Sequence, residues 1–182
     1  MHPNWFVALH AATDDPLELP PLADGMRPLH PDDYHVTVAF FGALPADPTD
    51  RLAAMIEEMR RPPLEAVADR ALLLPRPTHA SVVALHLQGD ALTDYIATWR
   101  DRLRAAVGLQ PEARSVLPHM TVVRMTPTRD RNRIEQRLHW AAQLQRRLPL
   151  RFRLTSVGLY TWRERPLSHQ PRYKATLCIA FD

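Results

Sequence analysis

Several residue types and patterns are scarce in this chain of 182 residues. It has one cysteine, Cys178, so it can form no intramolecular disulfide, and we expect it in a reducing compartment, the cytoplasm. Cys178 stands in an apolar segment, which predicts a buried, unreactive thiol rather than a nucleophile. Only five residues are glycine, and no glycine-rich loop that could cradle phosphates is present. No apolar run reaches membrane-spanning length, and residues 1–5 lack the pattern of a secretory signal peptide.

Lysine is also scarce, since Lys174 is the single lysine among 23 basic residues. The formal net charge of +3 conceals an asymmetry: residues 1–91 carry a net charge of −7 and residues 92–182 a net charge of +10. The densest basic segment runs from Arg129 to Arg153. A one-sided positive field suits a polyanionic partner, nucleic acid first, although the same pattern is typical of a solvated helix face. Both interpretations of the Arg129–Arg153 segment stay open.

Hydrophobic periodicity predicts a mixture of strands and helices. We expect strands over residues 5–10, 34–41, 64–74, 81–87, 117–123, 148–160 and 173–181. Helices are expected over residues 50–61, 91–107 and 128–147, the first capped by Thr49 or Asp50. The apolar face of the last helix should comprise Ile134, Leu138, Ala141 and Leu144. Residues 14–31 are expected to form a loop. This order, with hairpin-like neighbours, predicts an α+β fold with antiparallel sheets.

Two short segments match each other closely, residues 35–38 (His-Val-Thr-Val) and residues 119–122 (His-Met-Thr-Val). Side chains alternate between the faces of a strand, so His35 and Thr37 should share one face and the two valines the other. The same holds for His119 and Thr121. Two such faces across a cleft supply two titratable nitrogens and two hydroxyl donors, which suits acid–base chemistry on a phosphate without a metal.

The paired motifs resemble the signature of the 2H phosphoesterase superfamily. The flanking segments are similar to the bacterial RNA 2′,3′-cyclic phosphodiesterases, also called the 2′-5′ RNA ligase family. They are residues 5–9 (WFVAL), 34–42 (YHVTVAFFG), 118–124 (PHMTVVR) and 157–160 (VGLY). The resemblance covers nearly the whole chain and implies one bilobal domain over residues 1–182. It also implies two pseudo-symmetric lobes of antiparallel sheet backed by helices, with one motif strand from each lobe in a central cleft.

The activity that this resemblance implies is metal-independent hydrolysis of RNA 2′,3′-cyclic phosphate ends to 2′-phosphate. His35 would donate a proton to the departing 3′ oxygen, and His119 would be the base for the attacking water. Thr37, Thr121 and Arg124 would bind the phosphate. RNA with a cyclic phosphate end is therefore the expected partner, with no cofactor, no metal, no membrane and no obligate protein partner.

Other interpretations of these residues remain open. Four aromatic residues are candidates for stacking a terminal base, or else core residues: Tyr34, Phe41, Tyr160 and Trp162. The other histidines show no metal-ligand spacing, and Asp33 beside His35 is not taken as a ligand. The alternatives for function are the same site acting on 2′-5′-linked or small cyclic nucleotides, weak reverse 2′-5′ RNA ligation, and a non-catalytic RNA-binding module.

Overall fold

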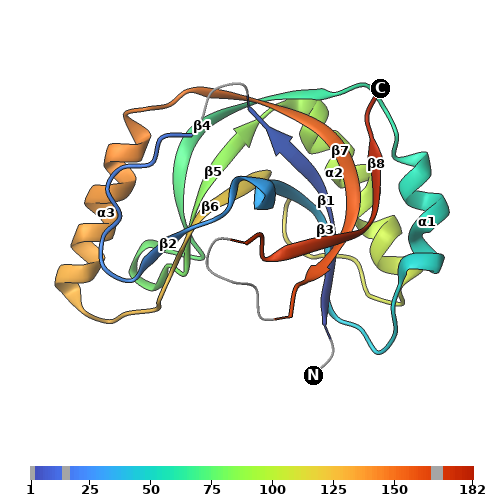
Figure 1. The fold of residues 1–182 in the computed structure, drawn as a ribbon, viewed down its shortest axis with the longest axis horizontal. Helices are drawn as coiled ribbons and strands as arrows, with labels where there is room; N and C mark the ends of the chain where they lie inside the picture. Colours follow the sequence, from blue (N-terminus) through green and yellow to red (C-terminus); the bar gives the residue numbers. More distant parts are fainter. Residues whose placement is uncertain (1–2, 14–16, 165–169) are drawn as a thin grey trace.

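Antiparallel strands and three α-helices alternate along the chain in the computed structural model, which describes residues 3–13, 17–164 and 170–182 (Figure 1). The strands are β1 (Asn4–Ala12), β2 (Met26–Pro28), β3 (His35–Ala43), β4 (Leu64–Leu74), β5 (Val82–Gln88), β6 (His119–Met125), β7 (Leu150–Trp162) and β8 (Tyr173–Ala180). The α-helices are α1 (Thr49–Glu58), α2 (Asp90–Ala106) and α3 (Arg131–Gln145), and two short 3₁₀ helices are η1 (Pro31–Asp33) and η2 (Pro77–His79). The predicted α+β class is confirmed.

The sequence prediction missed the short strand β2 and the 3₁₀ helix η2, and it placed some boundaries wrongly. Strand β2 lies inside the segment expected to be a loop, where it pairs with the end of β6. Residues 14–16 of that segment lie outside the described residues. Helix α3 begins later than expected, because the Asp130 carboxylate accepts hydrogen bonds from the N–H groups of Asn132 and Arg133 and so caps the helix there. At α1 the side chain that accepts from the first turn belongs to Asp47.

All strand pairs are antiparallel, and they form one sheet in the order β1-β3-β6-β5-β4-β7-β8, with an additional pairing of β1 with β7. That pairing closes a ring of six strands. Strands β1, β3, β7 and β8 form one half and β4, β5, β6 and β2 the other. The halves meet where β3 pairs with β6 and where β4 pairs with the start of β7. The lobes expected from the resemblance are therefore hydrogen-bonded to each other in one continuous sheet.

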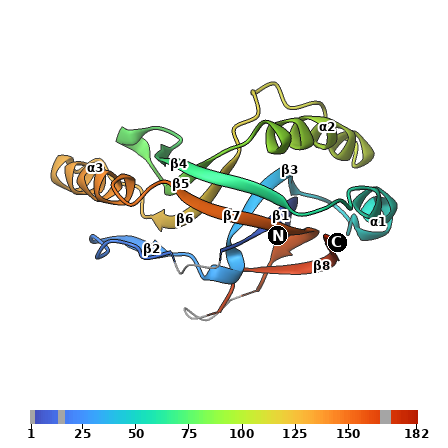
Figure 2. The same cartoon turned by 90° about the horizontal axis from the view of Figure 1, so that it is seen from above.

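Apolar helix faces cover the sheet. Helix α2 buries Leu92, Ile96, Trp99 and Leu103 as its periodicity predicts. Figure 2 shows α2 and β2 on opposite sides of the central strands, with α3 at one end of the molecule. The core lies between the helices and the face of the strands that carries Val36, Val38 and their neighbours. The opposite face is left for the motif histidines.

The predicted apolar face of α3 is partly wrong. Leu138 is 43% exposed, whereas Arg137 and Trp140 are buried. The indole N–H of Trp140 donates to the carbonyls of the segment before β2, at Pro20 and Pro21, and the Arg137 guanidinium donates to the Thr126 carbonyl at 2.7 Å. The helix thus turns toward polar carbonyls of two loops, an orientation that apolar periodicity alone does not predict.

The expectation that Cys178 is buried is also wrong, since its side chain is exposed. Strand β8 lies at an edge of the sheet and pairs only with β7 among the described residues. Its face with Leu177 and Ile179 packs on the core, so alternation turns Cys178 outward.

Gly158 in β7 sits where a side chain does not fit. A Cβ atom there would lie 2.8 Å from the carbonyl oxygen of Leu177 and 2.9 Å from the Tyr160 ring. Substitution Gly158→Ala should lower the free energy of unfolding by about 1–3 kcal/mol, measured by urea denaturation, because it forces β7 and β8 apart. Lys174→Ala on exposed β8 is the control. Equal denaturation midpoints for the two variants would contradict this account.

Candidate active site

One cross-strand pair, Val36 with Met120, joins β3 to β6 at the middle of both motifs. Continuing this antiparallel register by one residue each way places Thr121 opposite His35, and His119 opposite Thr37. The two motifs are therefore related by a local two-fold axis through the Val36–Met120 pair. Each histidine faces the threonine of the other motif.

The neighbouring strands extend this symmetry. Strand β1 pairs His10 with His35 and Ala8 with Thr37, and strand β5 pairs His86 with His119 and Ala84 with Thr121. Two rows of side chains thus cross the sheet on one face. The first row is His10, His35, Thr121 and Ala84, and the second row is Ala8, Thr37, His119 and His86. Each threonine thus has a histidine on one side and a small alanine on the other.

A β-bulge follows the threonine in each motif. Val38 has no partner on β1 and Val122 has none on β5, because the register shifts there. A bulge adds one residue and so resets the alternation of side chains. Two successive residues after each threonine face the core, and the next residue returns to the histidine face. On β6 that residue is Arg124, and on β3 it is Phe40.

The bulge changes the set of candidate stacking aromatics. Without it Phe41 would share a face with His35, but the side chain of Phe41 is buried in the core, and that of Tyr34 is buried as well. Their burial removes both from the residues that could stack a base. Phe40, which sequence reasoning passed over, is 52% exposed. The exposed ring beside two buried neighbours could have been found only by anticipating the bulge.

Both motif histidines are tethered in the same way. The Nδ1 atom of His35 lies 2.6 Å from the Asp33 carbonyl oxygen, and that of His119 lies 2.7 Å from the Leu117 carbonyl oxygen. Each carbonyl is two residues before its histidine and can only accept, so Nδ1 carries the proton and donates. The tether leaves Nε2 as the free nitrogen on each ring. Two imidazoles with the same tautomer, related by a two-fold axis, can act as a general acid and a general base.

The segment that tethers His35 is itself held in place. The buried Asp33 carboxylate accepts hydrogen bonds from the backbone N–H groups of Arg172, at 2.8 Å, and Tyr173, at 3.2 Å. It thereby fixes the start of β8 against η1. Asp33 is thus part of the scaffold of the site, where the sequence interpretation gave it no role.

Aromatic rings enclose His35. The Phe6 ring lies 5.0 Å from the imidazole between centroids, and the Tyr173 ring meets it edge-on at 5.2 Å. Burial lowers the pKa of His35 to about 4, which its hydrogen bond to Asp33 only partly offsets, and the nearby His119 and Arg124 lower it further. The imidazole is therefore neutral at pH 7 in the free protein.

Arg124 lies at the edge of this enclosure. It donates a hydrogen bond to the Tyr173 hydroxyl at 2.7 Å, and its guanidinium lies 5.6 Å from the centroid of the Trp162 ring. Its buried Nε has no hydrogen-bond partner among the described residues. Trp162 is 41% exposed, whereas Tyr160 is half-buried and stacks on Phe6. Of the four predicted stacking candidates, Trp162 has the most accessible ring.

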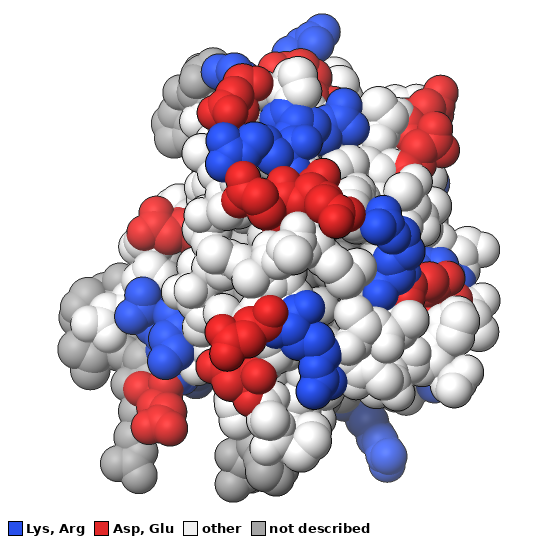
Figure 3. Space-filling view, turned by 90° about the vertical axis from the view of Figure 1, so that its right-hand side faces the viewer, with Lys and Arg blue, Asp and Glu red and all other residues white. Residues whose placement is uncertain are grey.

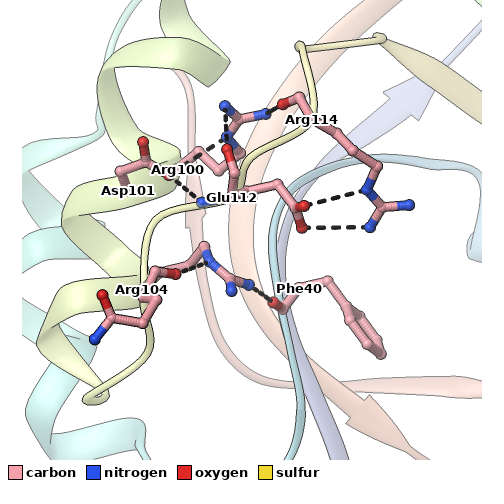
Figure 4. A network of polar contacts seen from close by, with 7 residues as sticks. Phe40, Arg100, Asp101, Arg104, Glu112 and Arg114 are labelled. Carbon is pink, nitrogen blue, oxygen red and sulfur yellow. Dashed lines mark hydrogen bonds and ion pairs between the residues drawn. The ribbon is translucent and has the colours of Figure 1, made fainter.

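A pocket of about 450 Å³ opens beside His119 and Thr37. Apolar side chains line one part and polar ones another; they include Phe40, Leu117, Ser81 and Arg114. Figure 4 shows how its wall is held: Arg104 of α2 donates to the Phe40 carbonyl at 2.7 Å, and the Phe40 ring points away from the helix. Arg100 donates to the Arg114 carbonyl at 2.9 Å, which secures the loop that also carries the tether of His119.

No group of three or more His, Cys, Asp or Glu side chains that could hold a metal occurs among the residues that the structure describes. No helix in the described part of the chain is long and apolar enough to cross a membrane. The hydroxyls of Thr37 and Thr121 make no hydrogen bond to another described residue.

Ion pairs in the folded chain neutralise part of the positive charge of the Arg129–Arg153 segment. Carboxylates pair with many of its arginines, the pairs being Arg131–Glu135, Arg133–Asp24, Arg147–Glu18 and Arg153–Glu65. The exposed remainder comprises Arg129, Arg146 and Arg151. Figure 3 shows the same intermixing of charge on the side of α1 and α2, where Arg60 pairs with Glu57 and Asp182. The acidic first half thus offsets much of the basic second half.

Comparison with known proteins places the chain in a family. The model of the 2′-5′ RNA ligase superfamily matches residues 8–166, which is most of the sequence and includes both motifs. The chain belongs to this superfamily. A curated archaeal protein, a tRNA (pseudouridine(54)-N(1))-methyltransferase of Halorubrum lacusprofundi, is 36% identical over 97 residues. That match covers 48% of this chain and 47% of the methyltransferase, so the chain spans about half the length of this relative.

Solved structures share the fold of this member of the 2′-5′ RNA ligase superfamily over its whole length. Escherichia coli LigT complexed with 3′-AMP is similar with a TM-score of 0.64 and 19% identity, covering 99% of each chain. TT0787 of Thermus thermophilus is similar with a TM-score of 0.65 and 16% identity, covering 98% of this chain and 97% of TT0787. At these identities the likeness establishes the fold.

The pKa of His35 predicts how stability depends on pH. Between about pH 6.5 and about pH 4 the unfolded chain binds a proton at His35 that the folded chain does not, so stability falls as the pH is lowered through this window. His35→Gln should therefore lose less unfolding free energy than the wild type between about pH 7 and about pH 4.5, measured by urea denaturation. The exposed His139→Gln is the control. An equal acid loss in wild type and His35→Gln would show that the folded protein does not disfavour the imidazolium.

Proposed function

We propose that this member of the superfamily hydrolyses the 2′,3′-cyclic phosphate ends of RNA to 2′-phosphates, by general acid–base catalysis without a metal. The observation that carries the proposal is the matched pair of tethered histidines, each with Nε2 free, related by the two-fold axis through Val36 and Met120. In-line displacement at phosphorus requires a base on one side and an acid on the other. Two imidazoles meet that requirement near neutral pH.

The groups around the histidines suit a phosphate. Thr37 and Thr121 lie beside the histidines of the opposite motifs, where their hydroxyls could donate to non-bridging oxygens. Arg124 stands at the edge of the site with a buried Nε that no described residue pairs, and a cation there would stabilise the charge that develops on phosphorus in the transition state. E. coli LigT, which shares the fold, has been crystallised with 3′-AMP and with phosphate.

The roles of the histidines follow the resemblance, with His35 as the proton donor and His119 as the base. A donor must be protonated, whereas burial keeps His35 neutral in the free protein. A bound phosphate places negative charge against the imidazole and raises its pKa, so we propose that His35 takes up its proton together with the substrate. His119 abstracts a proton from water, and His35 delivers one to the departing 3′ oxygen.

The pocket beside His119 is the proposed place of the terminal base. It opens from the reacting centre and carries the exposed ring of Phe40. An aromatic ring stacks any nucleobase, and the polar wall of the pocket, with Ser81 and Arg114, offers groups for its edge.

Alanine at either motif histidine should lower kcat for RNA with a 2′,3′-cyclic phosphate end by about 10²–10⁴-fold, because each removes a proton-transfer group. The measurement follows defined RNA ends in the presence of EDTA and separates 2′-phosphate from 3′-phosphate products. His139→Ala on the surface of α3 is the control.

Several outcomes would overturn parts of this proposal. Near-normal turnover by His35→Ala would remove the assigned site, and binding of RNA without turnover by the wild type would leave an RNA-binding module. Loss of activity in EDTA, restored by a divalent ion, would overturn the metal-independent mechanism. A 3′-phosphate product would reverse the orientation of the substrate between the two histidines.

Substitution Phe40→Ala should selectively lower kcat/KM for substrates that carry a base. Stacking contributes about 1–3 kcal/mol per base, so the ratio of kcat/KM for adenosine 2′,3′-cyclic phosphate to that for base-free ribose 2′,3′-cyclic phosphate should fall about tenfold. Phe40→Tyr keeps the ring and should keep the ratio. An unchanged ratio in Phe40→Ala would place the base elsewhere.

A further inference from the structure

A second histidine lies beside His119 and belongs to neither motif. His86 on β5 is the direct cross-strand partner of His119 and lies on the same face of the sheet, and its side chain is 15% exposed. The local two-fold axis gives His10 the equivalent place beside His35. The two histidines differ in their own contacts, because among the described residues His86 has a carboxylate partner and His10 has none.

That carboxylate belongs to Asp69, whose Oδ1 lies 2.6 Å from Nδ1 of His86. Asp69 is itself a bulge residue: β4 pairs Ala68 with Leu87 and Arg70 with His86, and leaves Asp69 without a partner on β5. Bulges of this kind redirect a side chain and are common beside active sites. The contact engages Nδ1 and leaves Nε2 as the free nitrogen of His86.

Helix α3 holds the bulge in place. The side-chain amide of Gln145 donates to the Asp69 carbonyl at 2.9 Å and accepts from the Ala71 N–H at 2.8 Å. Both backbone groups follow Ala68, the last residue of β4 that pairs with β7, so Gln145 binds β4 where that pairing has ended. Three elements, β4, β5 and α3, therefore fix one carboxylate–imidazole pair beside the proposed catalytic base.

A carboxylate, an imidazole and a guanidinium lie together here, and Nε of Arg70 also lies 3.6 Å from Oδ2 of Asp69. Burial alone would raise the pKa of Asp69, but its hydrogen bond to His86 and the charges of His86 and Arg70 hold that pKa below its usual value, so Asp69 is ionised at neutral pH. Arg70 pairs with His86 across the strands and is 59% exposed, with Nη2 3.4 Å from the imidazole Nδ1. An oriented imidazole and a guanidinium thus lie together, one and two strands away from His119.

The second row of side chains therefore continues outward from the reacting centre as Thr37, His119, His86 and Arg70. Neighbouring strands are separated by about 4.8 Å, so each step moves one strand further from the proposed cyclic phosphate. A nucleic acid chain carries one phosphate per nucleotide, and a row of donors that starts at one phosphate suits the next one. A free cyclic mononucleotide has no second phosphate to place there.

We propose that His86, oriented by Asp69, binds together with Arg70 the phosphodiester that precedes the terminal nucleotide, and so makes an RNA end a better substrate than a free cyclic mononucleotide. This inference rests on the proposed function and names the substrate class of the same site. The anion completes a set in which His86 donates from Nδ1 to Asp69 and from Nε2 to the phosphate. His86 must be protonated for both donations.

The test compares two substrates with the same terminal nucleotide: a nucleoside 2′,3′-cyclic phosphate and the dinucleotide that ends in it. The wild type should prefer the dinucleotide, measured as a ratio of kcat/KM. Loss of one charge-assisted hydrogen bond should reduce that ratio about tenfold in His86→Ala, mainly through KM, and Arg70→Ala and Asp69→Asn should reduce it in the same direction. His139→Ala should keep it.

A charge-retaining variant separates binding from mere structural support. His86→Arg should keep the dinucleotide preference, because a guanidinium at this position still supplies a cation and hydrogen-bond donors. The charged or titratable groups that face His86 are Asp69 and Arg70 from β4 and His119 from β6, and α3 contributes the neutral Gln145. Loss of the dinucleotide preference in His86→Arg would overturn the binding role of a cation at this position.

Two results would reject the inference and leave the proposed function standing. One is a His86→Ala variant with wild-type kcat/KM on both substrates, and the other is an equal loss on both substrates, which would mean that His86 acts only through the reacting centre. If neither substrate is turned over, the proposed function fails. In that case titration calorimetry compares the affinities for the matching mononucleotide and dinucleotide 2′-phosphates. Tighter binding of the dinucleotide by the wild type that is lost in His86→Ala supports the subsite. Equal affinities of the wild type for the two ligands reject it.

Discussion

The single pairing of Val36 with Met120 positions everything else in this site. It joins the two halves of the sheet at the centre of both motifs, and its antiparallel geometry sets each histidine opposite the threonine of the other motif. A shift of this pair by one residue would send both histidines to the core face, because strand side chains alternate. Buried side chains on both strands oppose such a shift, so packing of the core holds the motif histidines in register.

The bulges after the two threonines convert a simple repeat into a usable site. Each one allows two successive core residues and then returns the chain to the open face, which brings Arg124 to one end and Phe40 to the other. The two-fold relation therefore holds for the backbone and not for the chemistry that it presents. One end offers a cation near Trp162, and the other offers an aromatic ring beside a pocket.

The same asymmetry separates the two histidines. Rings of Phe6 and Tyr173 enclose His35 and favour its neutral form. His119 instead borders an open pocket and stands beside the Asp69–His86 pair. Two residues with identical tethers thus sit in different electrostatic surroundings, and environments of this kind are how a protein gives different protonation duties to chemically equal groups.

Sequence by itself determined the strands that carry the two motifs, the buried face of α2 and the α+β class, because each rests on local periodicity that the core then satisfies. It also identified His35 and His119 as equivalent residues of two matched motifs, since two matched four-residue motifs are specific. Only tertiary structure decided which of Phe40 and Phe41 faces the site, because a bulge depends on the partner strand and leaves no periodic mark. The buried arginine of α3, the exposed Cys178 and the cancellation of charge across the chain depend likewise on neighbours far away in sequence. The Asp69–His86 pair belongs to the same class, since 17 residues separate its members in sequence and a bulge held from α3 brings them to 2.6 Å.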